Sequence, residues 1–161
     1  MEENDNEFDD FERKNKYDKY HTNPYAQYSR DHNYLYVYMT FDYGWGLYPS
    51  KSLVFLYNSS DNTLKWAECE EPFTELGVKT LDKKIVIESV FTHKPYSDTE
   101  AVALSTDVSY YSVYMSSACC EKELMIEEDE KRRYPFFKHF FKIMDAHFKA
   151  TAKPYSNSDV K

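Results

Sequence analysis

The residues that most often carry catalytic or metal chemistry are thinly spread in this sequence. The three cysteines, Cys69, Cys119 and Cys120, lack the CxxC spacing of a zinc or redox site. Adjacent residues of a strand point to opposite faces, so Cys119 and Cys120 are poorly placed to hold one metal. A catalytic thiol also needs a base beside it, and nothing in the sequence brings His32 or His93 near one. Thiols without a catalytic role are therefore expected.

The histidines and carboxylates form no recognisable catalytic motif either. His139 and His147 are eight residues apart, which on one helix separates them by about 12 Å along the axis, too far to chelate one ion. There is no HExxH, GxGxxG or GxxxxGK motif, and no carboxylate pair stands out as acid and base. We therefore expect a protein that is not an enzyme, with no catalytic residues, no metal and no cofactor.

Tyrosine is the most distinctive chemical feature of the chain. The sequence has 16 tyrosines among 161 residues, within an aromatic content of 18%. Tyrosine is enriched at protein interfaces because it offers a large rigid surface and one hydrogen-bonding tip. On a strand, Tyr110 and Tyr114 would share one face and Tyr111 would point to the other. These three side chains are candidate partner contacts, and the alternative is that the rings only fill the core and its boundary.

Acidic residues are concentrated at the N-terminus. The net charge is -8, and residues 1–12 hold seven acids and no base, so the rest of the chain is nearly neutral. Such a block repels itself and stays solvated. The alternative is a segment that docks on a basic partner through Phe8 and Phe11. A basic cluster interleaved with tyrosines follows over 13–20 and could bind single-stranded nucleic acid, but the preceding acids oppose that interpretation.

Two smaller acidic clusters lie in the body of the chain. Glu68, Glu70 and Glu71 flank Cys69 and form a candidate contact surface for a basic partner. Residues 127–130 are all acidic and are followed by three bases, so each of three acids precedes a base by four residues. This order stabilises a helix. The second cluster therefore predicts a helix over 121–133 more than it predicts a docking patch.

The elements that must position these residues can be predicted from periodicity. Strict alternation over 34–41 predicts a strand with Leu35 and Val37 on one face and tyrosines on the other. Residues 52–57 and 63–67 predict a hairpin around the turn residues 58–62. Residues 85–91 and 109–115 predict further strands because they are rich in β-branched or aromatic side chains. Residues 99–105 could be partly helical, but we expect a strand that forms a second hairpin with 109–115. Gly44-Trp45-Gly46 predicts a turn.

Helices are expected mainly in the last third of the chain. Residues 72–76 suggest one helical turn closed by Gly77. Pro135 would end the helix over 121–133 and start another, since proline suits the first helical turn. The apolar stripe of that last helix would be Phe137, Phe140, Phe141, Met144 and Phe148.

Together these elements predict an α+β fold, an antiparallel sheet of about five strands packed by a C-terminal helical region. We expect an acidic tail and irregular lead-in over 1–33, a single domain over 34–153 and a polar tail over 154–161. No apolar run reaches about 18 residues and no secretory signal is visible, which predicts a cytoplasmic protein with reduced thiols and no membrane contact.

The sequence favours a non-enzymatic protein-binding module over the other functional classes. In its most concrete form this is an immunity or inhibitor protein that blocks the active site of a basic, nuclease-like toxin. The alternatives are a small ligand-binding protein or enzyme with a tyrosine-lined pocket between sheet and helix, and a viral or phage accessory protein that forms oligomers, such as a homodimer through exposed aromatics. The expected partner contacts are Glu68, Glu70, Glu71, Tyr110, Tyr111 and Tyr114.

Overall fold

An antiparallel sheet forms the centre of the molecule. The computed structural model describes residues 19–42, 50–70, 72–95 and 109–151. Within these residues, six strands pair in the order β4-β3-β2-β1-β5-β6, every pair antiparallel. The strands are β1 (Tyr34–Asp42), β2 (Lys51–Asn58), β3 (Thr63–Glu68), β4 (Thr74–Thr80), β5 (Tyr110–Ser116) and β6 (Glu121–Glu127). The predicted α+β class and the antiparallel sheet are confirmed.

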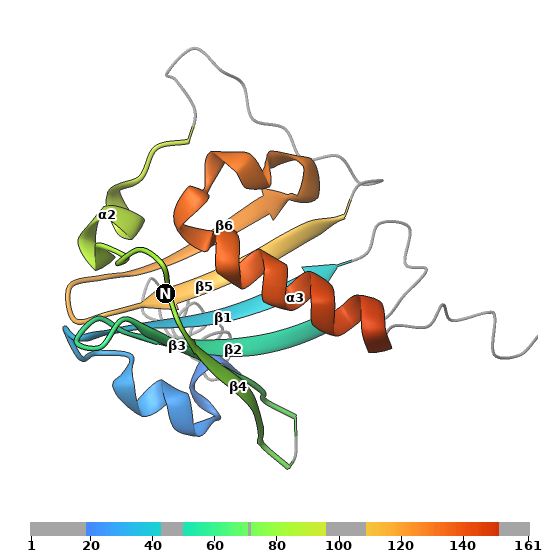
Figure 1. Ribbon diagram of the computed structural model, residues 1–161, viewed down its shortest axis with the longest axis horizontal. Helices are drawn as coiled ribbons and strands as arrows, with labels where there is room; N and C mark the ends of the chain where they lie inside the picture. Colours follow the sequence, from blue (N-terminus) through green and yellow to red (C-terminus); the bar gives the residue numbers. More distant parts are fainter. Residues whose placement is uncertain (1–18, 43–49, 71, 96–108, 152–161) are drawn as a thin grey trace, which may run out of the picture.

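The C-terminal helix covers one face of this sheet. Helix α3 (Lys138–Thr151) lies across the strands in Figure 1. It is preceded by two 3-10 helices, η4 (Glu128–Arg133) and η5 (Pro135–Phe137), and the short helix α2 (Ile87–Thr92) comes before β5. The predicted apolar stripe is confirmed, because all five of its side chains are buried against the sheet: Phe137, Phe140, Phe141, Met144 and Phe148.

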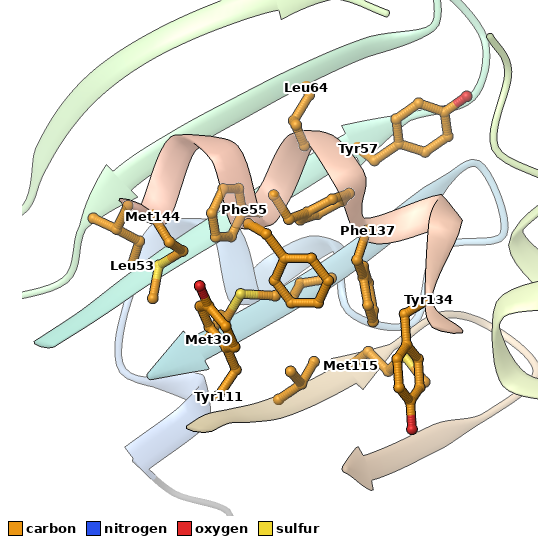
Figure 2. Packing of buried hydrophobic residues seen from close by; sticks show 14 of the residues in the cluster. Met39, Leu53, Phe55, Tyr57, Leu64, Tyr111, Met115, Tyr134, Phe137 and Met144 are labelled. Atoms are coloured by element: carbon orange, nitrogen blue, oxygen red, sulfur yellow. The ribbon is translucent and has the colours of Figure 1, made fainter. Parts of the chain in front are cut away.

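This face holds the larger core, which we call the helix-side cluster. It joins one face of β1, with Leu35 and Val37, to Phe55 of β2 and to the α3 stripe. Phe55 and Phe140 pack with their ring centres 4.9 Å apart. Figure 2 shows the rings and methionines of this layer filling the space between strands and helix. Side chains therefore pack the sheet–helix interface closely.

A second core lies on the opposite face and is made mainly of tyrosines. We call it the tyrosine-side cluster, which comprises Tyr20, Tyr25, Tyr36, Val54, Leu56, Ala67 and Tyr114. Tyr20 comes from η1 (Lys19–His21) and Tyr25 from η2 (Pro24–Tyr28), so residues before the sheet cover this face. Asn23 caps η2 by accepting a hydrogen bond from the Tyr25 N–H at 3.0 Å. The alternation predicted for 34–41 therefore serves two cores.

Three predicted elements are wrong. Residues 74–80 form strand β4, although the sequence suggested a helical turn over 72–76. The expected strand over 85–91 is helix α2, in which Ile87, Val90 and Phe91 lie on the face toward the helix-side cluster. Their spacing of three and one is also helical, so the β-branched composition was misleading.

The expected helix over 121–133 begins as strand β6. Lys122, Leu124 and Ile126 alternate with more exposed neighbours, the period of a strand, and β6 pairs with β5 along its whole length. The bases of this segment contact other acids: Arg133 Nε lies 2.6 Å from Glu130 Oε2, and Lys131 Nζ lies 2.9 Å from Asp145 Oδ2.

The other predicted strands, over 34–41, 52–57, 63–67 and 109–115, are confirmed as β1, β2, β3 and β5. The hairpin of β2 and β3 turns through Asn62, whose φ is 58°, a conformation that asparagine tolerates. The predicted turn at 44–46 and the segment 99–105 lie outside the described residues.

Candidate functional site

Two of the predicted contact tyrosines are buried. Tyr111 belongs to the helix-side cluster, where its hydroxyl donates to Asp145 Oδ1. Tyr114 belongs to the tyrosine-side cluster, stacks on Tyr20 at 4.2 Å and donates to Glu121 Oε2 at 2.6 Å. Burial, followed by the hydrogen bond to Glu121, raises the pKa of Tyr114. Both rings hold the fold together, from opposite faces of β5.

The other predicted contacts lie at the rim of the sheet. Tyr110 is half-buried at the start of β5 and Glu70 is exposed just after β3. Glu68 lies 2.7 Å from Nε2 of His147, near the end of α3. Glu71 lies outside the described residues. Strands β2 and β1 separate β3 from β5 in the sheet, so the glutamates and Tyr110 come from opposite halves of the strand order.

The strand register places a continuous set of side chains between these two halves, on the tyrosine face. Thr40 lies opposite Ser52 of β2 and Ser112 of β5, and Ser112 lies opposite Met125 of β6. In the next row, Asp42 lies opposite Tyr110, which lies opposite Glu127. We call these seven side chains the sheet patch: Thr40, Asp42, Ser52, Tyr110, Ser112, Met125 and Glu127.

The sheet patch is accessible and its charged members are acidic. Met125 is 48% exposed, and the other six side chains are half-buried, on the same face as the tyrosine-side cluster. Thr40 and Ser52 share a hydrogen bond of 2.8 Å. Ser50 donates to Asp42. The hydroxyl side chains therefore form one row with Met125, beside the row of Asp42, Tyr110 and Glu127.

Tyr38 joins the sheet patch to Glu70. Burial is the largest cause that raises the pKa of Tyr38 to about 12, followed by its hydrogen bond to Cys69, while Glu70 adds a smaller contribution. Burial also raises the pKa of the Cys69 thiol, which the carboxylates of Glu70 and Glu68 raise further. Cys69 is therefore poorly suited to act as a thiolate nucleophile.

The remaining cysteines and the possible metal ligands offer no clearer site for chemistry within the described residues. Mainly through its hydrogen bond to Cys120, the pKa of Cys119 is raised to about 11. Among the described residues, no group of three or more His, Cys, Asp and Glu side chains could hold a metal ion. In the same part of the chain, no helix is long and apolar enough to cross a membrane.

A tyrosine-lined cavity is also present on the tyrosine face. It has a volume of about 230 Å³ and lies between η2 and the strands β2 to β4, lined by Tyr25, Tyr28 and Tyr34 together with Lys65 and Glu75. Tyr25 donates to Glu75 Oε1 at 3.2 Å across it. The ligand-binding alternative placed such a cavity between sheet and helix, and this one lies beneath a 3-10 helix instead.

Sequence reasoning missed most of the sheet patch. Alternation over 34–41 places Thr40 beside the tyrosines, but the neighbours of β1 depend on long-range pairing. Met125 was assigned to a helix, so its place beside Ser112 was not predicted. A comparison with protein-family models finds no match, and a comparison with curated proteins finds no similar sequence.

Proposed function

We propose that this chain is a non-enzymatic protein-binding module whose sheet patch docks on a basic surface of a partner protein. The observation that carries the proposal is the register row of Asp42, Tyr110 and Glu127, which places one carboxylate on each side of a tyrosine. Acidic groups around an aromatic ring complement the lysines and arginines of a partner and speed its association. Tyr110 would supply the rigid contact area of an interface anchor.

The neighbouring residues support a protein partner. Thr40, Ser52 and Ser112 present short side chains, which let another backbone or a long cationic side chain approach the sheet. Met125 is flexible and polarizable, a property that suits adaptable contacts. Glu70 and the half-buried Tyr38 extend the acidic, aromatic character toward β3. Glu70 and Tyr110 thus keep their proposed role as partner contacts, and the buried Tyr111 and Tyr114 hold strand β5, which carries Tyr110, in place.

The most concrete form of the proposal is an inhibitor of a basic, nuclease-like toxin, such as an immunity protein. Enzymes that act on nucleic acids place lysine and arginine where phosphates bind. An acidic and aromatic surface would compete for those positions. A cytoplasmic location, which the sequence suggested, fits this role and is part of the proposal.

Site-specific cross-linking tests the location of the interface. A photo-crosslinking phenylalanine analogue is placed at Ser112, inside the sheet patch, and in a control protein at Val86, which is 63% exposed and belongs to another surface. Both proteins are irradiated in a lysate of the source cells, and adducts are identified by mass spectrometry. We expect one basic protein to be captured from position 112 and not from position 86. Equal capture from both positions, or no basic protein from position 112, would contradict the proposal.

A small-molecule function is the second candidate, favoured by the cavity at Tyr25, Tyr28 and Tyr34. Its volume of about 230 Å³ is slightly below the range of roughly 300–1,000 Å³ for drug-sized ligands. Oligomers formed through exposed aromatics find less support. None of the exposed large apolar residues in the described part of the chain is aromatic: they are Leu76, Val78, Val86 and Met125. A homodimer remains a prediction for light scattering.

A further inference from the structure

Two neighbouring cavities lie at the start of α3, on a surface that the proposed function does not use. The first, of about 390 Å³, lies between residues 81–90 and the segment from Pro135 to His139. The second, of about 530 Å³, lies between η4 and α3. Both are lined by Pro135 and Lys138, so they meet at these residues. Their volumes are in the range of small-molecule sites.

The floor of this double cavity is apolar. In the first part, Leu81, Ile85 and Val90 are buried, and Phe136 is half-buried beside them. In the second part, Tyr134 and Phe141 lie beneath the surface. A ligand with a ring or a short hydrocarbon part would therefore find contact area here, in addition to any charged contact.

The rim is basic. Lys83, Lys84 and Lys138 line the first part and Lys142 lines the second, and these four lysines make no ion pair within the described part of the chain. Two carboxylates are also present, but both are engaged. Asp82 Oδ1 lies 2.9 Å from His139 Nε2, and Asp145 Oδ2 lies 2.9 Å from Lys131 Nζ. The lysine charges are therefore only partly compensated.

A third observation concerns the wall of the first cavity. The Nδ1 atom of His139 is buried and has no hydrogen-bond partner among the described residues. An unsatisfied buried polar atom is costly, and His139 lines the first cavity. Arg132 lines the second cavity, where it pairs with Glu130 at 3.9 Å and donates to the Asp129 carbonyl at 2.6 Å.

We propose that this surface, which we call the lysine cleft, binds a small organic phosphate. The phosphoryl oxygens would lie among Lys83, Lys84 and Lys138, and the apolar part of the ligand on Pro135 and Phe136. Lysine ammonium groups bind phosphate as point charges. A small ligand fits the volumes of these cavities, about 390 and 530 Å³, which lie within the range of small-molecule sites.

Nuclear magnetic resonance of the full chain tests this site. The ¹⁵N-labelled protein is titrated with phenyl phosphate, inorganic phosphate and a short oligothymidylate, each at the same ionic strength. We expect saturable shifts from phenyl phosphate at residues 81–90 and 134–139, and at the ring nitrogens of His139. Phenyl phosphate should bind more tightly than inorganic phosphate, because only the former reaches the apolar floor.

Matched variants separate the cleft from general charge effects. Lys83→Gln with Lys84→Gln removes two cleft charges from exposed positions, and the control, Lys65→Gln with Lys79→Gln, removes two charges from β3 and β4. We expect the first pair to weaken phenyl phosphate binding about tenfold or more and the control to leave it within about twofold. Equal losses in both pairs, or shifts that never saturate, would overturn the proposal. Tighter binding of the oligothymidylate at the same residues would also overturn it, in favour of a nucleic-acid surface.

Discussion

Buried tyrosine hydroxyls connect separate segments of the chain. The Tyr36 hydroxyl accepts from Asn23 Nδ2 at 2.8 Å and donates to the carbonyl of Tyr20, so one fully buried group ties β1 to the N-terminal 3-10 helices. The Tyr57 hydroxyl donates to Asn62 at 2.7 Å and accepts from the Ile85 N–H at 3.0 Å. The many tyrosines thus serve as structural cross-links as well as core filling.

Removal of one such hydroxyl should destabilise the fold measurably. Tyr36→Phe leaves Asn23 Nδ2 and the Tyr20 carbonyl without this partner in a buried site, so we expect a loss of about 1–3 kcal/mol in the free energy of unfolding. The control is Tyr34→Phe on the same face, where the ring is half-buried and its hydroxyl makes no hydrogen bond within the described residues. Urea denaturation measures both. Equal stability of the two variants would show that the hydrogen bonds of Tyr36 contribute little.

The same burial makes the fold sensitive to alkali. Burial, the largest cause, and the hydrogen bond to Cys69 raise the pKa of Tyr38 to about 12, whereas an unfolded tyrosine ionises near 10. The folded state therefore holds its proton longer, and stability that is fully present below about pH 10 falls as the pH rises toward about 12. Urea midpoints from about pH 9 to 11 should decline, and Tyr38→Phe should decline less. An equal decline in the wild type and in Tyr38→Phe would show that other groups cause the loss of stability.

At the scale of elements, strand β4 depends on a contact that local sequence does not reveal. The Trp66 ring of β3 lies directly over Gly77 of β4, and a Cβ at position 77 would meet the Trp66 Cε2 and Cη2 atoms at 2.9 Å and the Cζ2 atom closer still. Glycine therefore serves here to let a ring pack on a strand, while the sequence interpretation took it as the end of a helical turn. The bulge between Trp66 and Ala67 falls at the same place.

A methyl group at position 77 should therefore loosen this edge of the sheet. We expect Gly77→Ala to destabilise the protein by about 1–3 kcal/mol through overpacking. Val78→Ala is the control, since Val78 is 59% exposed, and its effect should stay within about 0.5 kcal/mol. Combining Gly77→Ala with Trp66→Leu should cost less than the sum of the two single changes. Strict additivity in denaturation experiments would contradict the proposed collision.

The elements that could be predicted are those whose side-chain period matches the cores that they contact directly. The alternation of β1 and the apolar stripe of α3 each face a core directly, so their patterns are clear. Helix α2 and strand β6 carry mixed signals. The β-branched residues of α2 and the charge order after Glu127 reflect local propensity, which the packing of Val90 and Ile126 into the helix-side cluster overrides.

For the whole molecule, the sheet patch and the lysine cleft are two surfaces of opposite charge on different faces. The sheet patch on the tyrosine face carries Asp42 and Glu127, while the lysine cleft on the helix side carries Lys83, Lys84 and Lys138. The net charge of -8 hides this division. Glu70 and Tyr110 could be named from the sequence as candidate contacts. Thr40 of β1 and Ser52 of β2 lie between them, and only the strand order reveals this.

The affinity for a purified basic partner, once captured, tests the central claim that the sheet patch binds through its acids. Asp42→Asn with Glu70→Gln removes two charges at the patch and its border, and the control, Glu88→Gln with Asp129→Asn, removes two exposed acids elsewhere. We expect the wild type and the control to lose affinity alike between about 50 and 500 mM salt, and the patch variant to bind at least about tenfold more weakly at low salt with a shallower salt dependence. The account would be contradicted if the patch variant bound the partner as tightly as the wild type and if salt did not change the affinity of either protein.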